Sequence, residues 1–148
     1  MNNKIPPPIV TLISGLAIYF SRNLFPNHHG IILDVFSALL LIFGIIIIRS
    51  AFLLFKNNQT TINPLNLTKT SSIVNTGVFK YTRNPMYLGM AFILLSVALK
   101  FNIYGGLIVI LIFFSFITKF QIIPEEKAME KLFGQEFKNY KKTTRRWL

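Results

Sequence analysis

The chain has few acidic residues and no cysteine. Of its 148 residues only five are Asp or Glu, against 16 Lys and Arg, which gives a formal net charge of +11. The lack of cysteine excludes disulfide bonds, thiolate zinc sites and cysteine nucleophiles. The two histidines, His28 and His29, are neighbours in a short loop. Two adjacent loop side chains do not make a metal site by themselves, so no metal is expected.

Charged residues are scarce overall, and apolar residues are abundant. Charged residues make up 14% of the chain, whereas about 25% is typical of soluble proteins. Hydrophobic residues make up 52%, with 15 Phe and a mean hydropathy of +0.51. We therefore predict an all-α integral membrane protein. The basic residues flank the apolar runs, a pattern typical of topology signals and contacts with anionic lipid headgroups. This pattern argues against a nucleic-acid partner.

Apolar runs predict about four transmembrane helices. Three runs, at 5–25, 31–55 and 103–123, are long enough to cross a bilayer, which takes about 20 residues. The run at 86–99 is shorter, and the sequence leaves open whether it crosses. No clear cleavage site follows the first run, so we expect a retained helix rather than a signal peptide. The tail, 124–148, has the spacing of an amphipathic helix at the membrane surface.

We expect residues 1–148 to form a single membrane domain. It divides into two N-terminal helices (1–55), a polar cytosolic connector (56–85), and a helical hairpin and tail that form the cofactor site (86–148). The connector and the tail hold most of the Lys and Arg. With four crossings they lie on one side together with the N-terminus, and the positive-inside rule makes that side cytosolic.

Two polar motifs flank the hairpin, "RNPMY" at 83–87 and "PEE" at 124–126. Arg83 is a permanent cation with a planar fork of donors, Tyr87 offers a ring and a hydroxyl, and the two glutamates are anions. Because a hairpin returns to the side on which it began, we expect the motifs to lie together. They could hold a ligand that has mixed charge, a flat ring and hydroxyls. Each residue also has a structural interpretation, as a topology signal, a helix start or a charge at a helix dipole.

The order and spacing of these residues resemble the isoprenylcysteine carboxyl methyltransferase family, especially its small bacterial members. The segments that carry the resemblance are "SSIVNTGVFKYTRNPMYLG" at 71–89 and "PEEKAMEKLFGQEFKNYKKTTRRW" at 124–147. The family consists of integral membrane enzymes that use S-adenosylmethionine and take a lipophilic acceptor from the bilayer. The resemblance implies the same cofactor and reaction here. We expect the chain in the bacterial inner membrane with both termini cytosolic.

The resemblance also assigns residues by position. The cofactor-binding residues it implies are Ser71, Ser72, Ile73, Val74, Phe79, Asn84, Pro85, Met86, Tyr87 and Glu125. The chemistry of the acceptor suggests two catalytic residues: Arg83, which could orient an anionic acceptor or simply mark the cytosolic side, and Glu126, the nearest base for an amine acceptor. Eukaryotic members carry His where Asn84 stands, and at the position of Gln121 an Arg associated with the substrate carboxylate. The acceptor therefore stays open between the carboxylate of a prenylated cysteine and a lipid head group.

Two other functions remain open. Steroid and sterol reductases, which use NADPH, are similar in the C-terminal half, although they bring further polar motifs that this chain lacks. The chain could also be a small non-enzymatic membrane subunit whose basic faces bind lipid headgroups. The sequence does not fix the oligomeric state.

Overall fold

The computed structural model describes residues 5–26, 30–58 and 72–148, and within these ranges it contains helices and no strands. The main helices are α1 (Pro7–Phe20), α2 (Ile31–Asn57), α3 (Pro85–Phe101), α4 (Ile103–Ile117), α5 (Ile123–Phe133) and α6 (Gln135–Thr143). Two short 3₁₀ segments, η1 (Ser21–Leu24) and η3 (Gly77–Lys80), and a π-helical turn, η4 (Thr118–Ile122), complete the described structure.

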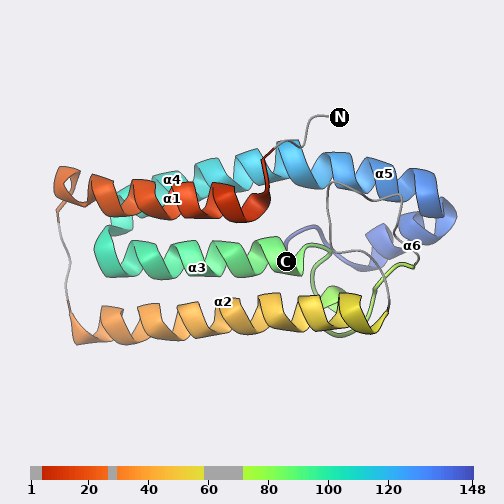
Figure 1. Ribbon diagram of the computed structural model, residues 1–148, viewed down its shortest axis with the longest axis horizontal. Helices are drawn as coiled ribbons and strands as arrows, with labels where there is room; N and C mark the ends of the chain where they lie inside the picture. The colour runs from red at the N-terminus through yellow and green to blue at the C-terminus, as the bar shows by residue number, and fades with distance from the viewer. Residues whose placement is uncertain (1–4, 27–29, 59–71) are drawn as a thin grey trace.

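Helix α3 lies in the middle of the bundle. Helix α2 covers one side of it, and α1 and α4 cover the other (Figure 1). Consecutive main helices from α1 to α4 run in opposite directions, so the start of α3 and the end of α4 lie at the same end (Figure 1). Helices α5 and α6 extend from that end, which is the right-hand end in Figure 1. The bundle therefore brings the two polar motifs to one end.

Helices α2 and α3 pack so closely that their backbones are in contact at Gly44 and Gly89. A Cβ atom added at Gly44 would lie 2.7 Å from the carbonyl oxygen of Gly89, and one added at Gly89 would lie 2.6 Å from Ile48 Cγ1. The hydroxyl of Ser37 donates to the carbonyl oxygen of Ser96 at 3.0 Å across the same interface. Small residues and hydroxyl contacts of this kind are typical of helices packed in a membrane.

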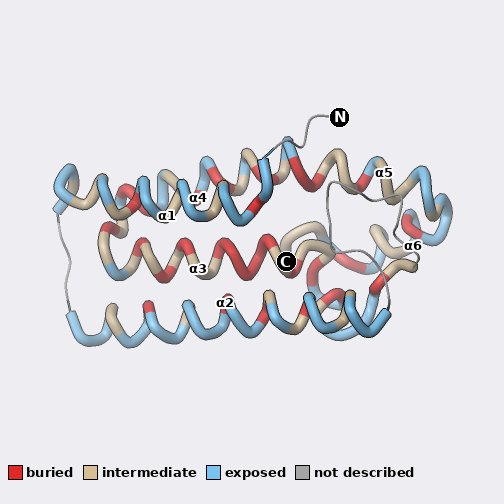
Figure 2. The backbone as a smooth tube through the Cα atoms, in the orientation of Figure 1, coloured by how far each residue is buried: buried red, intermediate tan, exposed pale blue. Residues whose placement is uncertain are grey.

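The outer surface of the bundle is apolar. Helix α2 is exposed along most of its length while α3 is mostly buried (Figure 2). Exposed side chains on α2 include Ile31, Ile32, Val35, Phe36, Leu39, Ile42, Phe43, Ile45 and Ile46, and those on α4 include Leu107, Ile108, Leu111 and Ile112. Soluble proteins rarely expose contiguous apolar patches of this extent. Such a surface is suited to lipid, in agreement with the predicted membrane protein.

Among the residues that the structure describes, two helices are long and apolar enough to cross a membrane, Ile31–Asn57 and the continuous helix Ile103–Phe133. Helix α3 has 17 residues and α1 has 14. At 1.5 Å per residue, α3 is roughly 26 Å long, somewhat short of the roughly 30 Å hydrocarbon core. The topology with about four crossings therefore stays a prediction.

The fourth apolar run and the first part of the tail form one long helix, Ile103–Phe133, rather than two separate ones. Pro124 lies in the first turn of α5, as its position suggested, but α5 continues from α4 through η4. A proline inside a helix has no N–H to donate and clashes with the carbonyl four residues earlier. The π-helical turn directly before Pro124 widens the backbone there, which relieves that clash.

The predicted amphipathic tail is divided into two helices. Gly134, between α5 and α6, has a φ of +51°, in the left-handed region that glycine adopts without steric cost. The chain turns at this residue, and α6 folds back toward the segment before α3 (Figure 1). The turn brings the last residues of the chain onto the site described below.

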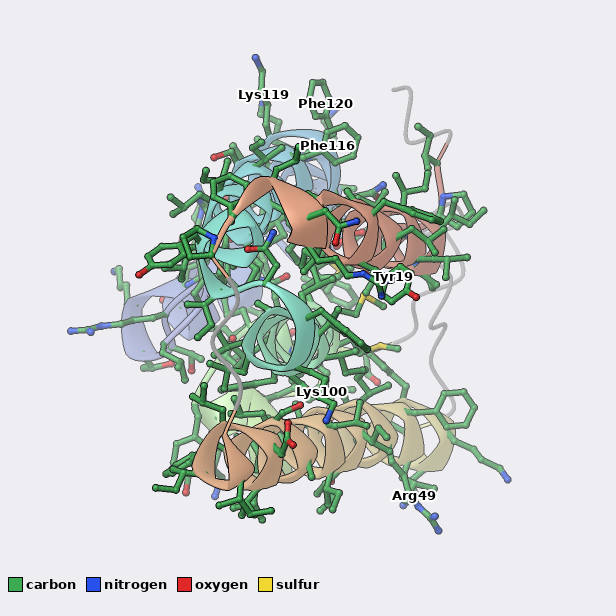
Figure 3. All side chains as sticks on the ribbon, turned by 90° about the vertical axis from the view of Figure 1, so that its left-hand side faces the viewer. Tyr19, Arg49, Lys100, Phe116, Lys119 and Phe120 are labelled. Carbon is green, nitrogen blue, oxygen red and sulfur yellow. The ribbon has the colours of Figure 1, made fainter. Side chains whose placement is uncertain are left out.

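The end of the bundle opposite that site carries a salt bridge, Lys100 Nζ to Asp34 Oδ1 at 2.8 Å, between α3 and α2. Arg49 points outward from α2, away from the other helices (Figure 3). His28 and His29 lie outside the described residues.

Candidate functional site

The two polar motifs meet at a partly buried tyrosine–glutamate pair. The hydroxyl of Tyr87, in the first turn of α3, donates to Glu125 Oε1 in the first turn of α5 at 2.6 Å. Tyr87 is 8% exposed and packs in the core with Met90 and Ile122. A hydroxyl–carboxylate bond of this length is charge-assisted and strong. The hairpin thus brings together two residues that the resemblance assigned to the cofactor.

Beside this pair, one carboxylate holds two arginines. Glu126 Oε1 accepts from Arg83 Nη2 at 2.7 Å and from Arg146 Nε at 3.1 Å, and Glu126 Oε2 accepts from Arg146 Nη2 at 2.7 Å. The side chains of Glu126 and Arg83 are 10% and 9% exposed. The hydrogen bond to Glu126 raises the pKa of Arg146, and burial opposes this by less. The three residues form a fixed ionic cluster that joins the start of α3, α5 and the C-terminal end.

The geometry bears on the roles expected of Arg83 and Glu126. Glu126 already accepts three hydrogen bonds from guanidinium groups, so it is better suited to hold two cations together than to remove a proton. Arg83 also donates through Nη1 to the carbonyl oxygens of Thr144 and Lys141. Its Nε is one of the buried side-chain atoms without a partner in the described part of the chain.

Residues 144–147 run across this site, and we call them the C-terminal strap. The backbone N–H of Arg83 donates to the carbonyl oxygen of Arg145 at 2.9 Å. The carbonyl oxygen of Arg146 accepts from Asn84 Nδ2 at 2.9 Å and from Thr82 Oγ1 at 3.1 Å. The strap therefore binds the segment directly before α3 through both backbone and side-chain groups.

The other cofactor residues that the resemblance implied lie in the segment before α3 and at its start. Val74 and Phe79 are buried with Ala51 of α2, and Met86 packs against them. Pro85 is fully buried at the first position of α3. Val74, Phe79 and Met86 belong to a second apolar cluster next to the end of α2, separate from the core that contains Tyr87.

Ser71 lies outside the described residues. The hydroxyl of its neighbour Ser72 is buried and has no partner within the described part of the chain. Ile73 lines a cavity of about 420 Å³ between the segment before α3 and α6, together with Asn75, Lys80, Glu136, Asn139, Tyr140, Thr143 and Thr144. This volume lies in the range of small-molecule sites.

Tyr140 forms a wall of the cavity and is held firmly. Its hydroxyl donates to the carbonyl oxygen of Phe79 at 2.7 Å, and burial raises the pKa of Tyr140 to about 12. Sequence reasoning assigned no site role to Tyr140 or Arg146, although both lie in the segment that carries the resemblance. Of the predicted residues that the structure describes, only Ile73 lines this cavity.

Gln121 lies in η4 and is 1% exposed. Its Nε2 donates to the carbonyl oxygen of Ile5 at 2.8 Å, so it ties the residues before α1 to the long helix. In the part of the chain that the structure describes, no group of three or more His, Asp or Glu side chains could hold a metal ion.

Comparisons with known proteins agree with the motifs. A family model described as phospholipid methyltransferase matches residues 33–136, from α2 into α6. An uncharacterized protein of Haemophilus influenzae is 40% identical over 63 residues, which is 43% of this chain and the whole of that relative. No solved structure matches the chain. The matched family range contains the pairs Tyr87–Glu125 and Arg83–Glu126 and ends before the C-terminal strap.

Proposed function

Because the chain belongs to the phospholipid methyltransferase family, whose members are membrane methyltransferases, we propose that it transfers a methyl group from S-adenosylmethionine to a lipophilic acceptor in the bilayer. The acceptor is the carboxylate of a prenylated cysteine or a lipid head group. The site would face the cytosol of a bacterial cell, with the chain in the inner membrane. Most of the described basic residues lie at the end of the bundle that carries the site, which supports this orientation.

The observation that carries the proposal is the partly buried hydrogen bond between Tyr87 and Glu125, 2.6 Å long, where the start of α3 meets the start of α5. S-adenosylmethionine has an ammonium group, a carboxylate, ribose hydroxyls and an adenine ring. Glu125 would pair with the ammonium group or a ribose hydroxyl. The hydroxyl of Ser72 and the Nε–H of Arg83 have no partner among the described residues, and both are donors suited to the carboxylate. The residues present therefore fit this cofactor.

When bound, S-adenosylmethionine supplies a methyl group on a sulfonium centre, which leaves as a neutral thioether once the methyl is transferred. The task of the chain is alignment and exclusion of water. Tyr87 and Glu125 are joined by a hydrogen bond. Tyr87 packs in an apolar core with Met90 and Ile122, and these side chains would exclude water from that side of the site. Arg83 is fixed by Glu126 and would orient an anionic acceptor.

An acceptor carboxylate is ionised at neutral pH and needs no general base, whereas an amine must lose a proton. Glu126 is the base expected for an amine, yet its oxygens are engaged by Arg83 and Arg146. This arrangement favours an acceptor that is already anionic. It makes Glu126 the residue that keeps Arg83 in place.

The proposal is tested by following labelled methyl transfer from S-adenosylmethionine into a lipid extract. We expect label in the lipid fraction with the wild-type protein, and a loss of roughly tenfold or more with Tyr87→Phe, because a hydrogen bond to a charged group contributes about 1.5–3 kcal/mol. The matched control is Tyr81→Phe, at a tyrosine that is 74% exposed. Equal activity of both variants would contradict the role of the pair.

The alternatives give different results with the same purified protein. An NADPH-dependent reductase would be stabilised against heat by NADPH and would transfer no label. A non-enzymatic subunit would be stabilised against heat by neither NADPH nor S-adenosylhomocysteine. Stabilisation by S-adenosylhomocysteine alone supports the methyltransferase.

A further inference from the structure

The C-terminal strap is attached at both of its ends to parts of the site that are far apart in sequence. At one end, Thr144 contributes its carbonyl oxygen to Arg83 Nη1 and its hydroxyl to the carbonyl oxygen of Lys80 at 3.5 Å. At the other end, Trp147 Nε1 donates to Thr118 Oγ1 at 3.2 Å. The strap thus reaches from the segment before α3 to the π-helical turn η4.

The indole of Trp147 packs at a defined position on the long helix. Its ring meets that of Phe114 edge to face, with centroids 4.6 Å apart, a geometry that aromatic pairs favour. Between the two anchors, Arg146 holds Glu126 through two hydrogen bonds. Docking of Trp147 therefore places Arg146 on the carboxylate that also fixes Arg83.

The strap also supplies partners that the segment before α3 cannot supply itself. The backbone N–H of Arg83 and the amide nitrogen of Asn84 donate to strap carbonyls. Without the strap these groups lose their partners, and Arg83 keeps only its bond to Glu126 and its weaker contact with Lys141. The position of the residues that lead into Tyr87 thus depends on four residues near the C-terminus.

We infer that the C-terminal strap is a positioning element of the methyl-donor site, and that docking of Trp147 on η4 and binding of the donor stabilise each other. This inference rests on the proposed function. Segments outside the packed helices open locally at a lower cost than the core, and the side chain of Arg146 in the strap is 36% exposed. Because coupling between two equilibria is reciprocal, a donor that prefers the ordered site must also favour the docked strap.

The first experiment needs no variant, because Trp147 is the single tryptophan of the chain. Its fluorescence is measured in detergent with the quencher acrylamide, while S-adenosylhomocysteine is added. We expect quenching to fall as the ligand binds, with the same midpoint concentration as the ligand shows in calorimetry. Quenching that is unchanged at saturating ligand would overturn the coupling.

The second experiment breaks the Trp147–Thr118 hydrogen bond from each side and measures the dissociation constant of S-adenosylhomocysteine. Thr118→Val and Trp147→Phe should each weaken binding roughly two- to tenfold, as the loss of one hydrogen bond implies. The double variant should bind no more weakly than the worse single variant, because both changes remove the same contact. Thr118→Ser restores the hydroxyl and should restore binding.

The matched control is Ser115→Ala, on the exposed face of α4, where the hydroxyl bonds only within its own helix, to Leu111. It should leave the dissociation constant unchanged. Variants that melt at lower temperature but bind the ligand as the wild type does would show a structural role alone and overturn the inference, while the proposed function would stand. A wild-type protein that does not bind S-adenosylhomocysteine would overturn both.

Discussion

Replacing Glu126 by Gln tests how far the ionic cluster stabilises the fold. Glutamine keeps the shape and one acceptor oxygen but removes the charge that compensates Arg83, whose side chain is 9% exposed. Removing one partner of a buried ion pair costs about 3–5 kcal/mol. The side chain of Arg146, at 36% exposed, is partly screened by solvent. We therefore expect Glu126→Gln to lower the free energy of unfolding by about 2–4 kcal/mol.

The assay is reversible unfolding of the purified protein in mixed micelles, followed by the helical circular dichroism signal. The matched control is Glu130→Gln, one turn further along α5, because the Glu130–Lys141 pair has the same type of bond but is 34% exposed on both sides. Such a pair contributes less than about 1 kcal/mol. If Glu126→Gln lowers the free energy of unfolding by no more than Glu130→Gln does, the ionic cluster does not stabilise the contact between the start of α3 and α5.

Two further changes probe the packing and the tail. Gly89→Val should destabilise the protein by about 1–3 kcal/mol, since the new side chain meets Ile48 at 2.6 Å, whereas Gly15→Ala, with its nearest neighbour at 3.9 Å, should be neutral in thermal melts. Tyr140→Phe should cost about 1 kcal/mol through the lost bond to the carbonyl of Phe79. Because the pKa of Tyr140 rises from 10 to about 12 on folding, wild-type stability should be complete below pH 10 and fall as the pH rises toward 12. Melting temperatures across that range should fall less steeply in Tyr140→Phe than in the wild type.

The helices could be predicted because each apolar run has a clear length and clear polar limits. The run predicted at 31–55 became Ile31–Asn57, and the short run at 86–99 became Pro85–Phe101. The continuity of α4 with α5 was not predicted, because proline is common at the first position of a helix and Pro124 therefore indicated a new helix. Nothing in the local pattern indicates that a π-helical turn lets the helix continue. The fold back at Gly134, which has a positive φ, was also missed, because an isolated glycine inside a helical pattern does not show whether the helix continues or ends there.

The meeting of Tyr87 with Glu125 follows from topology, since a hairpin of two helices returns its ends to one place. The participation of Arg146 and Trp147 could not be derived from periodicity. An extended strap has no repeating pattern, and its partners Glu126 and Thr118 are some 20 to 30 residues earlier. The only sequence signal was the basic–aromatic ending, which also occurs in ordinary membrane-surface tails.

Calorimetric titration of the purified protein with S-adenosylhomocysteine, and separately with NADPH, tests the central claim most directly. We predict saturable binding of S-adenosylhomocysteine, no binding of NADPH, and a loss of about 1.5–3 kcal/mol in binding free energy for Glu125→Gln, because one charged hydrogen bond is removed. Binding of NADPH without S-adenosylhomocysteine, or equal affinity of Glu125→Gln and the wild type, would contradict the claim that α3 and α5 jointly hold a methyl donor.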